Sequence, residues 1–442
     1  MKKLIYASAI VAAGLSSCAQ NEIESVPALD QDNAVGFSTY SGNTKGKEMT
    51  YEMLQEKGFG LFGYYHKWRE GNGYDIAGWE NEDPSWKGAD FMNNHKLAYD
   101  ANAVGTIGHW IYSPIKYWPN NVRDRISFIG YAPYVDLSQI DPDQAEGIMS
   151  IDAATDCDAI YPTSKAPTIE YRMHKNPTDM IDLVGAVAFD QGKIEGGGLN
   201  GYENVVDLDF EHLMTKVRFY ARLNGQILDD IKDGSKDTKV YVTALKLVGP
   251  ENNTLLNKNG YREQSNALFT AGNFNYCGQA EFATTGMIGG WKDLSNEGIG
   301  EYYDLDQDGF LNFTKIKDTN YSKRGTEVVV NNYHGPIALV SDDEALYLLP
   351  PNNGEGLTED QSVKVYVEYD VVTTDPKLPN GGRHVTTNRD IVDLNKTSLK
   401  MGVAYNVTIE IDVKSVNVDA DVAEWEDEWF GVNTPNDSKD PK

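Results

Sequence analysis

The sequence predicts an all-β protein built from antiparallel β-sandwiches, on three observations. Two segments, 363–371 and 403–413, place apolar side chains at every second position, which is the period of a strand with one buried face. Gly and Asn residues interrupt the rest of the chain at short intervals, which disfavours long helices. Many short strands separated by turns are typical of antiparallel sandwiches.

Residues 1–17 have the pattern of a lipoprotein signal peptide. Two lysines precede an apolar run, Ile5 to Leu15, which is too short to span a bilayer. The run ends in Leu15-Ser16-Ser17-Cys18, which resembles a bacterial lipobox, where the cysteine becomes the lipid-carrying N-terminus. We therefore expect lipidation of Cys18 and export from the cytoplasm; a short buried helix with a chance cysteine is the alternative.

Residues 18–33 are polar and are interpreted as a tether, followed by an N-terminal β-sandwich domain over 34–200. Val35 and Phe37 alternate with small residues and predict one short strand at its start. Met49 to Glu56 could form two helical turns. Compact aromatic or alternating apolar residues predict further strands at 59–65, 126–132, 206–210 and 217–221.

The glycine-rich segment 196–201 is the predicted boundary, because nothing in it can hold a strand. A C-terminal β-sandwich domain is expected over 201–430, with two helical turns at Gly225 to Lys232 and a polar tail over 431–442. The alternation of 403–413 shifts phase at Lys414-Ser415 and continues to residue 422, which predicts either a bulge or a tight connection between two strands.

The chain is strongly acidic, with a formal net charge of −28 over 442 residues. Such a chain repels nucleic acid and anionic membrane surfaces, so no nucleic acid is expected as a partner. Cys157 and Cys277 fall on opposite sides of the predicted boundary. A disulfide is permitted in an oxidising compartment, but this placement favours two free, buried thiols.

The sequence predicts no enzyme. It contains no Gly-x-Ser-x-Gly elbow, no His-Glu-x-x-His and no phosphate-binding Gly-x4-Gly-Lys-Ser/Thr. The seven histidines are scattered and are not paired at metal-ligand spacing. His212, at the end of a predicted strand, is interpreted as structural.

One segment, 304–312, resembles the first nine positions of an EF-hand-type calcium loop. It offers side-chain oxygens and one backbone carbonyl from Asp304, Asp306, Asp308, Phe310 and Asn312. The twelfth position is lysine rather than a bidentate glutamate, so Ca²⁺ binding requires a carboxylate from elsewhere. An acidic surface turn is the alternative.

Three tryptophans, Trp68, Trp79 and Trp86, lie in or beside a stretch rich in Gly, Asn and Asp. Exposed tryptophans can stack on sugar rings, so these residues are candidate glycan contacts. The alternative is that they pin a long loop to a sheet.

The order and spacing of several segments resemble the Mfa-like fimbrillins, the subunits of type V pili. The matching segments are 34–37, 59–65, 90–94, 110–114, 116–119, 126–133, 206–217, 401–409 and 422–425. The resemblance covers nearly all of the mature chain, and 206–217 is similar to the family's phenylalanine-x-histidine strand.

This resemblance implies two transthyretin-like antiparallel β-sandwich domains and no enzyme activity. Family members are exported as lipoproteins to the outer membrane, and a trypsin-like protease removes the first strand. The groove then accepts a strand from a neighbouring subunit. Val35 and Phe37 would fill that groove before cleavage, and Lys45 and Lys47 stand where the family commonly has an arginine.

The expected function is therefore a fimbrial subunit that supports adhesion. Its expected partners are other subunits, the outer membrane through Cys18, and a host or bacterial surface glycan or protein. The rival hypothesis is a surface lipoprotein that binds glycans without polymerising. A stalk, tip or anchor role is left open.

Overall fold

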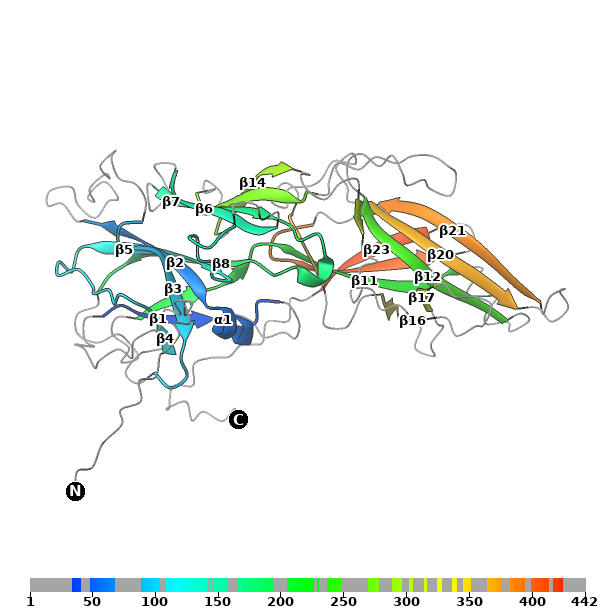
Figure 1. Cartoon of the computed structure of the whole chain (residues 1–442), viewed down its shortest axis with the longest axis horizontal. Coiled ribbons are helices and arrows are strands. Elements are labelled where there is room, and N and C mark those ends of the chain that lie inside the picture. Colours follow the sequence, from blue (N-terminus) through cyan, green and yellow to red (C-terminus); the bar gives the residue numbers. More distant parts are fainter. Residues whose placement is uncertain are drawn as a thin grey trace, which may run out of the picture.

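The computed structural model describes residues 34–40, 48–67, 89–103, 109–141, 144, 146–157, 165–193, 205–225, 229, 237–248, 269–277, 288–295, 302–304, 314–315, 324–327, 336–339, 345–350, 364–374, 382–393, 399–412 and 416–423. The molecule is elongated, with strands β1 to β8 towards one end and β12, β17, β20 and β21 towards the other (Figure 1). Within these residues, no helix combines the length and apolar character needed to cross a bilayer.

Three of the sheets contain strands from the first half of the chain. A two-stranded sheet pairs β1 (Gly36–Tyr40) with β9 (Val205–Asp209). A six-stranded sheet runs in the order β10 (Glu211–His212), β8 (Val184–Gln191), β5 (Arg125–Ala132), β2 (Phe59–His66), β3 (Met92–Tyr99) and β4 (Trp110–Ile111). A four-stranded sheet runs β14 (Gly290–Ser295), β13 (Ala271–Asn275), β7 (Lys165–Arg172) and β6 (Gly147–Asp156).

Two further sheets are built from strands between residues 215 and 423. One contains β18 (Ile337–Ala338), β11 (Thr215–Leu223), β22 (Ala404–Ile411) and β23 (Val416–Ala423), with β19 (Leu346–Leu348) also on β11. The other contains β16 (Thr314–Lys315), β17 (Arg324–Glu327), β12 (Asp237–Val248), β20 (Lys364–Thr374) and β21 (Arg383–Asp393), with β15 (Tyr302–Asp304) also on β12.

Helix α1 (Tyr51–Lys57) begins two residues after the predicted start, Met49, and ends one residue after the predicted end, Glu56. The residues on either side of the helix explain where it begins and ends. The Thr50 hydroxyl accepts a hydrogen bond from the Met53 N–H at 3.1 Å, which caps the first turn. Gly58 ends the helix at φ 68°, a left-handed conformation that favours glycine. A short 3-10 helix, η3 (Pro177–Asp179), precedes β8. The second predicted helix, Gly225 to Lys232, lies mostly outside the described residues.

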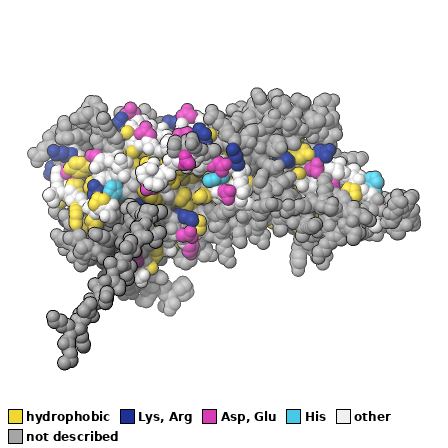
Figure 2. All heavy atoms as spheres, viewed as in Figure 1, with side chains coloured by type: hydrophobic (Ala, Val, Ile, Leu, Met, Phe, Trp, Pro, Cys, Tyr) yellow, Lys and Arg dark blue, Asp and Glu magenta, His cyan; other side chains and the backbone are white. Residues whose placement is uncertain are grey.

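Alternation along the chain explains which faces are buried. In β11 the apolar residues Val217, Phe219 and Ala221 are fully buried, while the residues between them are partly exposed. One apolar cluster surrounds β1 and includes the inward side chains of β2, β5 and β9. A larger cluster connects the four-stranded sheet with the sheets around β11 and β12. On the face drawn in Figure 2, the described acidic and basic side chains lie interspersed rather than segregated.

The protein is mostly β with several antiparallel sheets, as predicted, but two pairings are parallel: β1 with β9 and β11 with β22. The phase shift at Lys414-Ser415 corresponds to a connection between two strands, because β22 and β23 pair antiparallel from Ile411 opposite Val416. Pairings also cross residue 200, since β9 joins β1, β10 joins β8 and β13 joins β7. The division into two domains at that residue stays a prediction.

Candidate functional site

The candidate site is strand β1 together with the apolar surface that it covers. Val35 and Phe37 are 2% and 0% exposed, whereas the intervening and following residues are partly exposed. The Phe37 ring meets the rings of Tyr112 and Phe128 edge-on, with centroids 5.6 and 5.2 Å apart. The alternation read from the sequence therefore places both side chains in the apolar cluster around β1.

One edge of β1 is paired along its whole length. The strand runs parallel to β9, from Gly36 opposite Val205 to Tyr40 opposite Asp209. The backbone of β9 therefore forms the hydrogen-bonding edge on which β1 lies. A further backbone hydrogen bond lies just before the first residue of β1, where the Val35 N–H donates to the Lys116 carbonyl at 3.0 Å.

Two buried aromatic side chains, one in β4 and one just after it, hold β1 and the residue before it. The Tyr112 hydroxyl donates to the Val35 carbonyl at 2.8 Å, and Trp110 Nε1–H donates to the Thr39 hydroxyl at 2.9 Å. Burial raises the pKa of Tyr112, so its hydroxyl stays protonated and remains a donor at physiological pH. The acceptor in this contact is the backbone carbonyl of residue 35, so the hydrogen bond does not depend on which side chain occupies that position.

The other N-terminal candidates lie outside the described residues. These are Cys18, the predicted lipid site, and Lys45 and Lys47, the predicted cleavage sites. The chain is described again from Glu48 onward. Lipidation and cleavage at these residues stay predictions.

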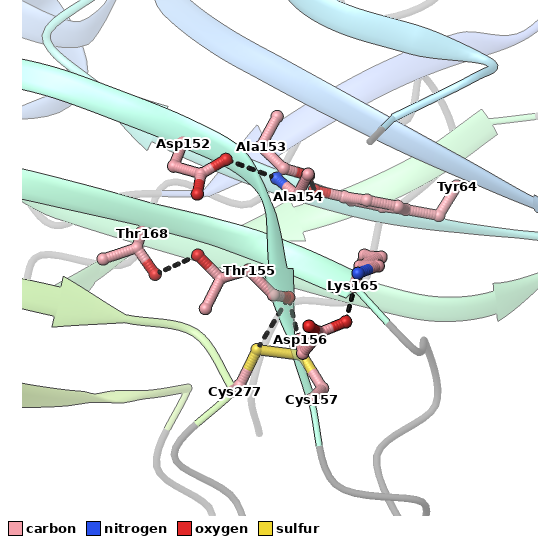
Figure 3. A network of polar contacts seen from close by, with 10 residues as sticks. All are labelled: Tyr64, Asp152, Ala153, Ala154, Thr155, Asp156, Cys157, Lys165, Thr168 and Cys277. Carbon is pink, nitrogen blue, oxygen red and sulfur yellow. Dashed lines mark hydrogen bonds and ion pairs between the residues drawn. A yellow bond between two sulfur atoms is a disulfide. The ribbon is translucent and has the colours of Figure 1, made fainter. Parts of the chain in front are cut away.

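The prediction of two free thiols at Cys157 and Cys277 is wrong. The two residues form a disulfide, with their Cα atoms 5.0 Å apart. Cys157 directly follows β6 and Cys277 follows β13, and both strands pair with β7, so the bond joins the ends of the two strands that flank it (Figure 3). The error came from assigning the cysteines to separate domains, because strand period says nothing about the pairing of β13 with a strand far earlier in the chain.

The predicted calcium loop and glycan contacts are not placed by the structure. Asp304 ends β15, but its side chain and the other candidate ligands, Asp306, Asp308, Phe310 and Asn312, lie outside the described residues. Trp68, Trp79 and Trp86 lie outside them as well. In the part of the chain that is described, no group of three or more His, Cys, Asp or Glu side chains could hold a metal ion.

Calcium binding by the 304–312 loop can be tested by thermal unfolding. If the ion binds, the wild-type Tm should rise with Ca²⁺, because a ligand at 100 times its Kd stabilises the folded state by about 2.7 kcal/mol. Replacing both Asp304→Ala and Asp306→Ala should remove the dependence on calcium and leave the Tm in chelator unchanged. If the wild-type Tm does not respond to calcium, the segment 304–312 is an acidic surface turn and not a calcium site.

Sequence reasoning missed the polar partners of the predicted elements. His212 is structural, as predicted, because its Nδ1 lies 2.6 Å from Oδ2 of Asp182. Asp182 itself had no signal in the sequence, since an isolated aspartate before a strand is common in a chain this acidic. The role of Tyr112 as a donor was equally invisible, because its acceptor, the Val35 carbonyl, lies far away in the sequence.

No family model matches the chain. The chain is 28% identical over 422 residues to the fimbrium subunit Fim1C of Phocaeicola vulgatus, and the alignment covers 94% of each protein. Its fold is similar to the crystal structure of a fimbrial protein from Bacteroides vulgatus ATCC 8482, with a TM-score of 0.61 and 23% identity over 89% of this chain and 99% of that one. The resemblance to fimbrial subunits that the sequence indicated is confirmed.

Proposed function

We propose that this chain, a member of the Bacteroidales fimbrium-subunit family, is a structural subunit of a cell-surface fimbria that supports adhesion. Its precursor is exported as a lipoprotein, and a protease removes the N-terminal segment with β1. The vacated groove then accepts a strand from a neighbouring subunit. The observation that carries this proposal is the burial of Phe37 in β1, and of Val35 just before it, a few residues upstream of Lys45 and Lys47.

The physical logic is strand replacement. Loss of β1 uncovers the edge of β9 and the apolar positions that Val35 and Phe37 occupied. Main-chain hydrogen bonds give affinity to an incoming strand, and alternate side-chain pockets set its register. An open apolar groove promotes aggregation, so covering it with β1 until the subunit reaches the surface protects the precursor.

We also propose a division into two domains and a location outside the cytoplasm. We assign two transthyretin-like sandwiches, over 34–200 and 201–430, whose strands intermix at the junction. The Cys157–Cys277 disulfide supports a location outside the reducing cytoplasm. The partners are other fimbrial subunits, the outer membrane through the Cys18 lipid, and a surface glycan or protein as adhesion target, without catalysis by this chain.

Controlled proteolysis tests the assembly step. Mild trypsin treatment of the purified precursor should remove the N-terminal segment that carries β1 and produce a ladder of oligomers on a gel. A surface lipoprotein that only binds glycans would remain a monomer after the same treatment. A cut chain that stays monomeric would therefore favour that rival function.

The lipid can be tested separately with Cys18→Ser. Without the thiol no diacylglyceryl group can be attached, so the variant should stay unprocessed or appear soluble in the periplasm. Membrane fractionation measures the difference, with Ser16→Ala as the control that retains the cysteine. Outer-membrane anchoring of Cys18→Ser at the wild-type level would rule out the lipoprotein interpretation.

A further inference from the structure

The first residues described after the predicted cleavage sites are buried rather than exposed. Glu48, Met49 and Thr50 are 3%, 1% and 3% exposed. Glu48 forms an ion pair with Lys216, and both side chains are almost completely buried. Lys216 belongs to β11, so this pair ties the beginning of the processed chain to a sheet whose strands lie between residues 215 and 423.

A second buried contact holds the next residue. The Met49 N–H donates to Oδ2 of Asp182 at 3.2 Å, and the same oxygen lies 2.6 Å from Nδ1 of His212. The Asp182 side chain is fully buried, and its other oxygen, Oδ1, has no hydrogen-bond partner. Releasing Met49 would leave this carboxylate with fewer partners in an environment that water does not reach, which is costly.

These contacts lead directly into α1. Thr50 caps the helix, and Leu54 in its second turn is fully buried. Glu48, Met49, Asp182, His212 and Lys216 are together called the clamp. It holds Glu48 and Met49 from β11, β10 and the segment before β8. The ion pair and hydrogen bonds just described differ from those that hold β1, while the Met49 side chain packs in the same apolar cluster as Phe37.

We propose that the clamp selects the processing site: it protects the Lys47–Glu48 bond in the folded precursor and leaves the Lys45–Gly46 bond as the one that is cut. This inference rests on the cleavage step of the proposed function and adds which lysine is used. The clamp also keeps residues from Glu48 onward in place when β1 departs, so that loss of the strand does not spread into α1.

The Lys47–Glu48 bond is protected because a protease requires an extended substrate. A trypsin-like enzyme binds several residues on both sides of the scissile bond in extended form, so a folded segment must open locally before it is cut. Cutting after Lys47 requires Glu48, Met49 and Thr50 to leave their buried contacts. After a cut at Lys45, the first two residues on the C-terminal side of the scissile bond are Gly46 and Lys47, and the buried residues of the clamp begin only after them, at Glu48.

The test is limited trypsin digestion of the full unprocessed chain, with the new N-termini identified by mass spectrometry. Wild type and Lys47→Gln should both yield Gly46 at equal rates, whereas Lys45→Gln should resist cutting in this region. The combination Lys45→Gln and Lys216→Met leaves Glu48 buried without its ion-pair partner. It should accelerate cutting after Lys47 by about tenfold or more, because proteolysis follows the population of the opened segment.

Several outcomes would overturn the proposal. These are a Glu48 N-terminus from the folded wild type, cutting of Lys45→Gln at the wild-type rate, or no cutting at either lysine. If Lys216→Met fails to fold, hydrogen exchange of the wild type decides: slow exchange at the Met49 amide supports the clamp, and exchange as fast as in an unfolded peptide refutes it. A Gly46 product that never oligomerises would leave the clamp intact and count against the proposed function alone.

Discussion

Phe37→Asp is expected to destabilise the uncut chain by about 3–5 kcal/mol, the range for losing a buried aromatic residue. The phenyl ring is fully buried between Tyr112 and Phe128, and the substitution puts a carboxylate there without a partner. Urea unfolding of the precursor measures the change. Val122→Asp is the matched control, because Val122 is 40% exposed and a new carboxylate there should change stability by less than about 0.5 kcal/mol.

The same variant distinguishes a replaceable strand from a tether. After cleavage the mutated strand is gone, so trimmed Phe37→Asp and trimmed wild type should polymerise alike. If Phe37→Asp changes neither the stability of the precursor nor its export yield, residues 34–40 act only as a tether. If removal of residues 18–45 leaves a wild-type chain that never oligomerises, an anchor or a glycan binder becomes the better interpretation.

Loss of the Cys157–Cys277 disulfide is expected to cost about 2–5 kcal/mol, the usual range for a native disulfide. The two cysteines are 120 residues apart, so the bond removes much conformational freedom from the unfolded chain. It also joins the ends of β6 and β13, next to the Lys165–Asp156 ion pair that links β7 to β6 (Figure 3). For a domain of 150–250 residues, the change corresponds to a decrease in Tm of about 10 °C.

The measurement is thermal unfolding with and without reductant. Wild type should lose stability on reduction, while the double variant Cys157→Ser and Cys277→Ser should start from the lower Tm and be insensitive to reductant. Cys18→Ser in both proteins removes the remaining thiol and prevents intermolecular disulfides. Equal Tm values for wild type in the two conditions would mean that the bond contributes nothing to stability.

Much of the local structure could be predicted from the sequence. Alternation predicted β11, β20 and the two strands β22 and β23, and in β11 and β22 it identified the residues of the buried face. The aromatic segments that became β2 and β5 were equally clear. By contrast, β12 and β21, two of the longest strands, were not recognised. In β21 the described side chains are mostly exposed or half-buried, so the alternation of apolar residues is weak.

The candidate site was predicted only in part. Val35 and Phe37 were identified because an apolar residue at every second position is visible in a short window. Their surroundings come from distant parts of the chain: the edge of β9, the donors Tyr112 and Trp110, and the ring of Phe128. None of these residues has a local pattern that identifies its partner.

The sequence by itself determined many of the strands and which residues of several of them face the core, and it predicted a lipoprotein signal. These properties depend on neighbouring residues, because the two-residue period of a strand is a local feature. The tertiary structure decided which strands pair, such as β1 with β9 and β13 with β7. It also decided the contacts that depend on those pairings, including the Cys157–Cys277 disulfide and the ion pair between Lys216 and Glu48. Strand pairing depends on hydrogen bonds and packing between distant segments, which the period of a single strand does not specify.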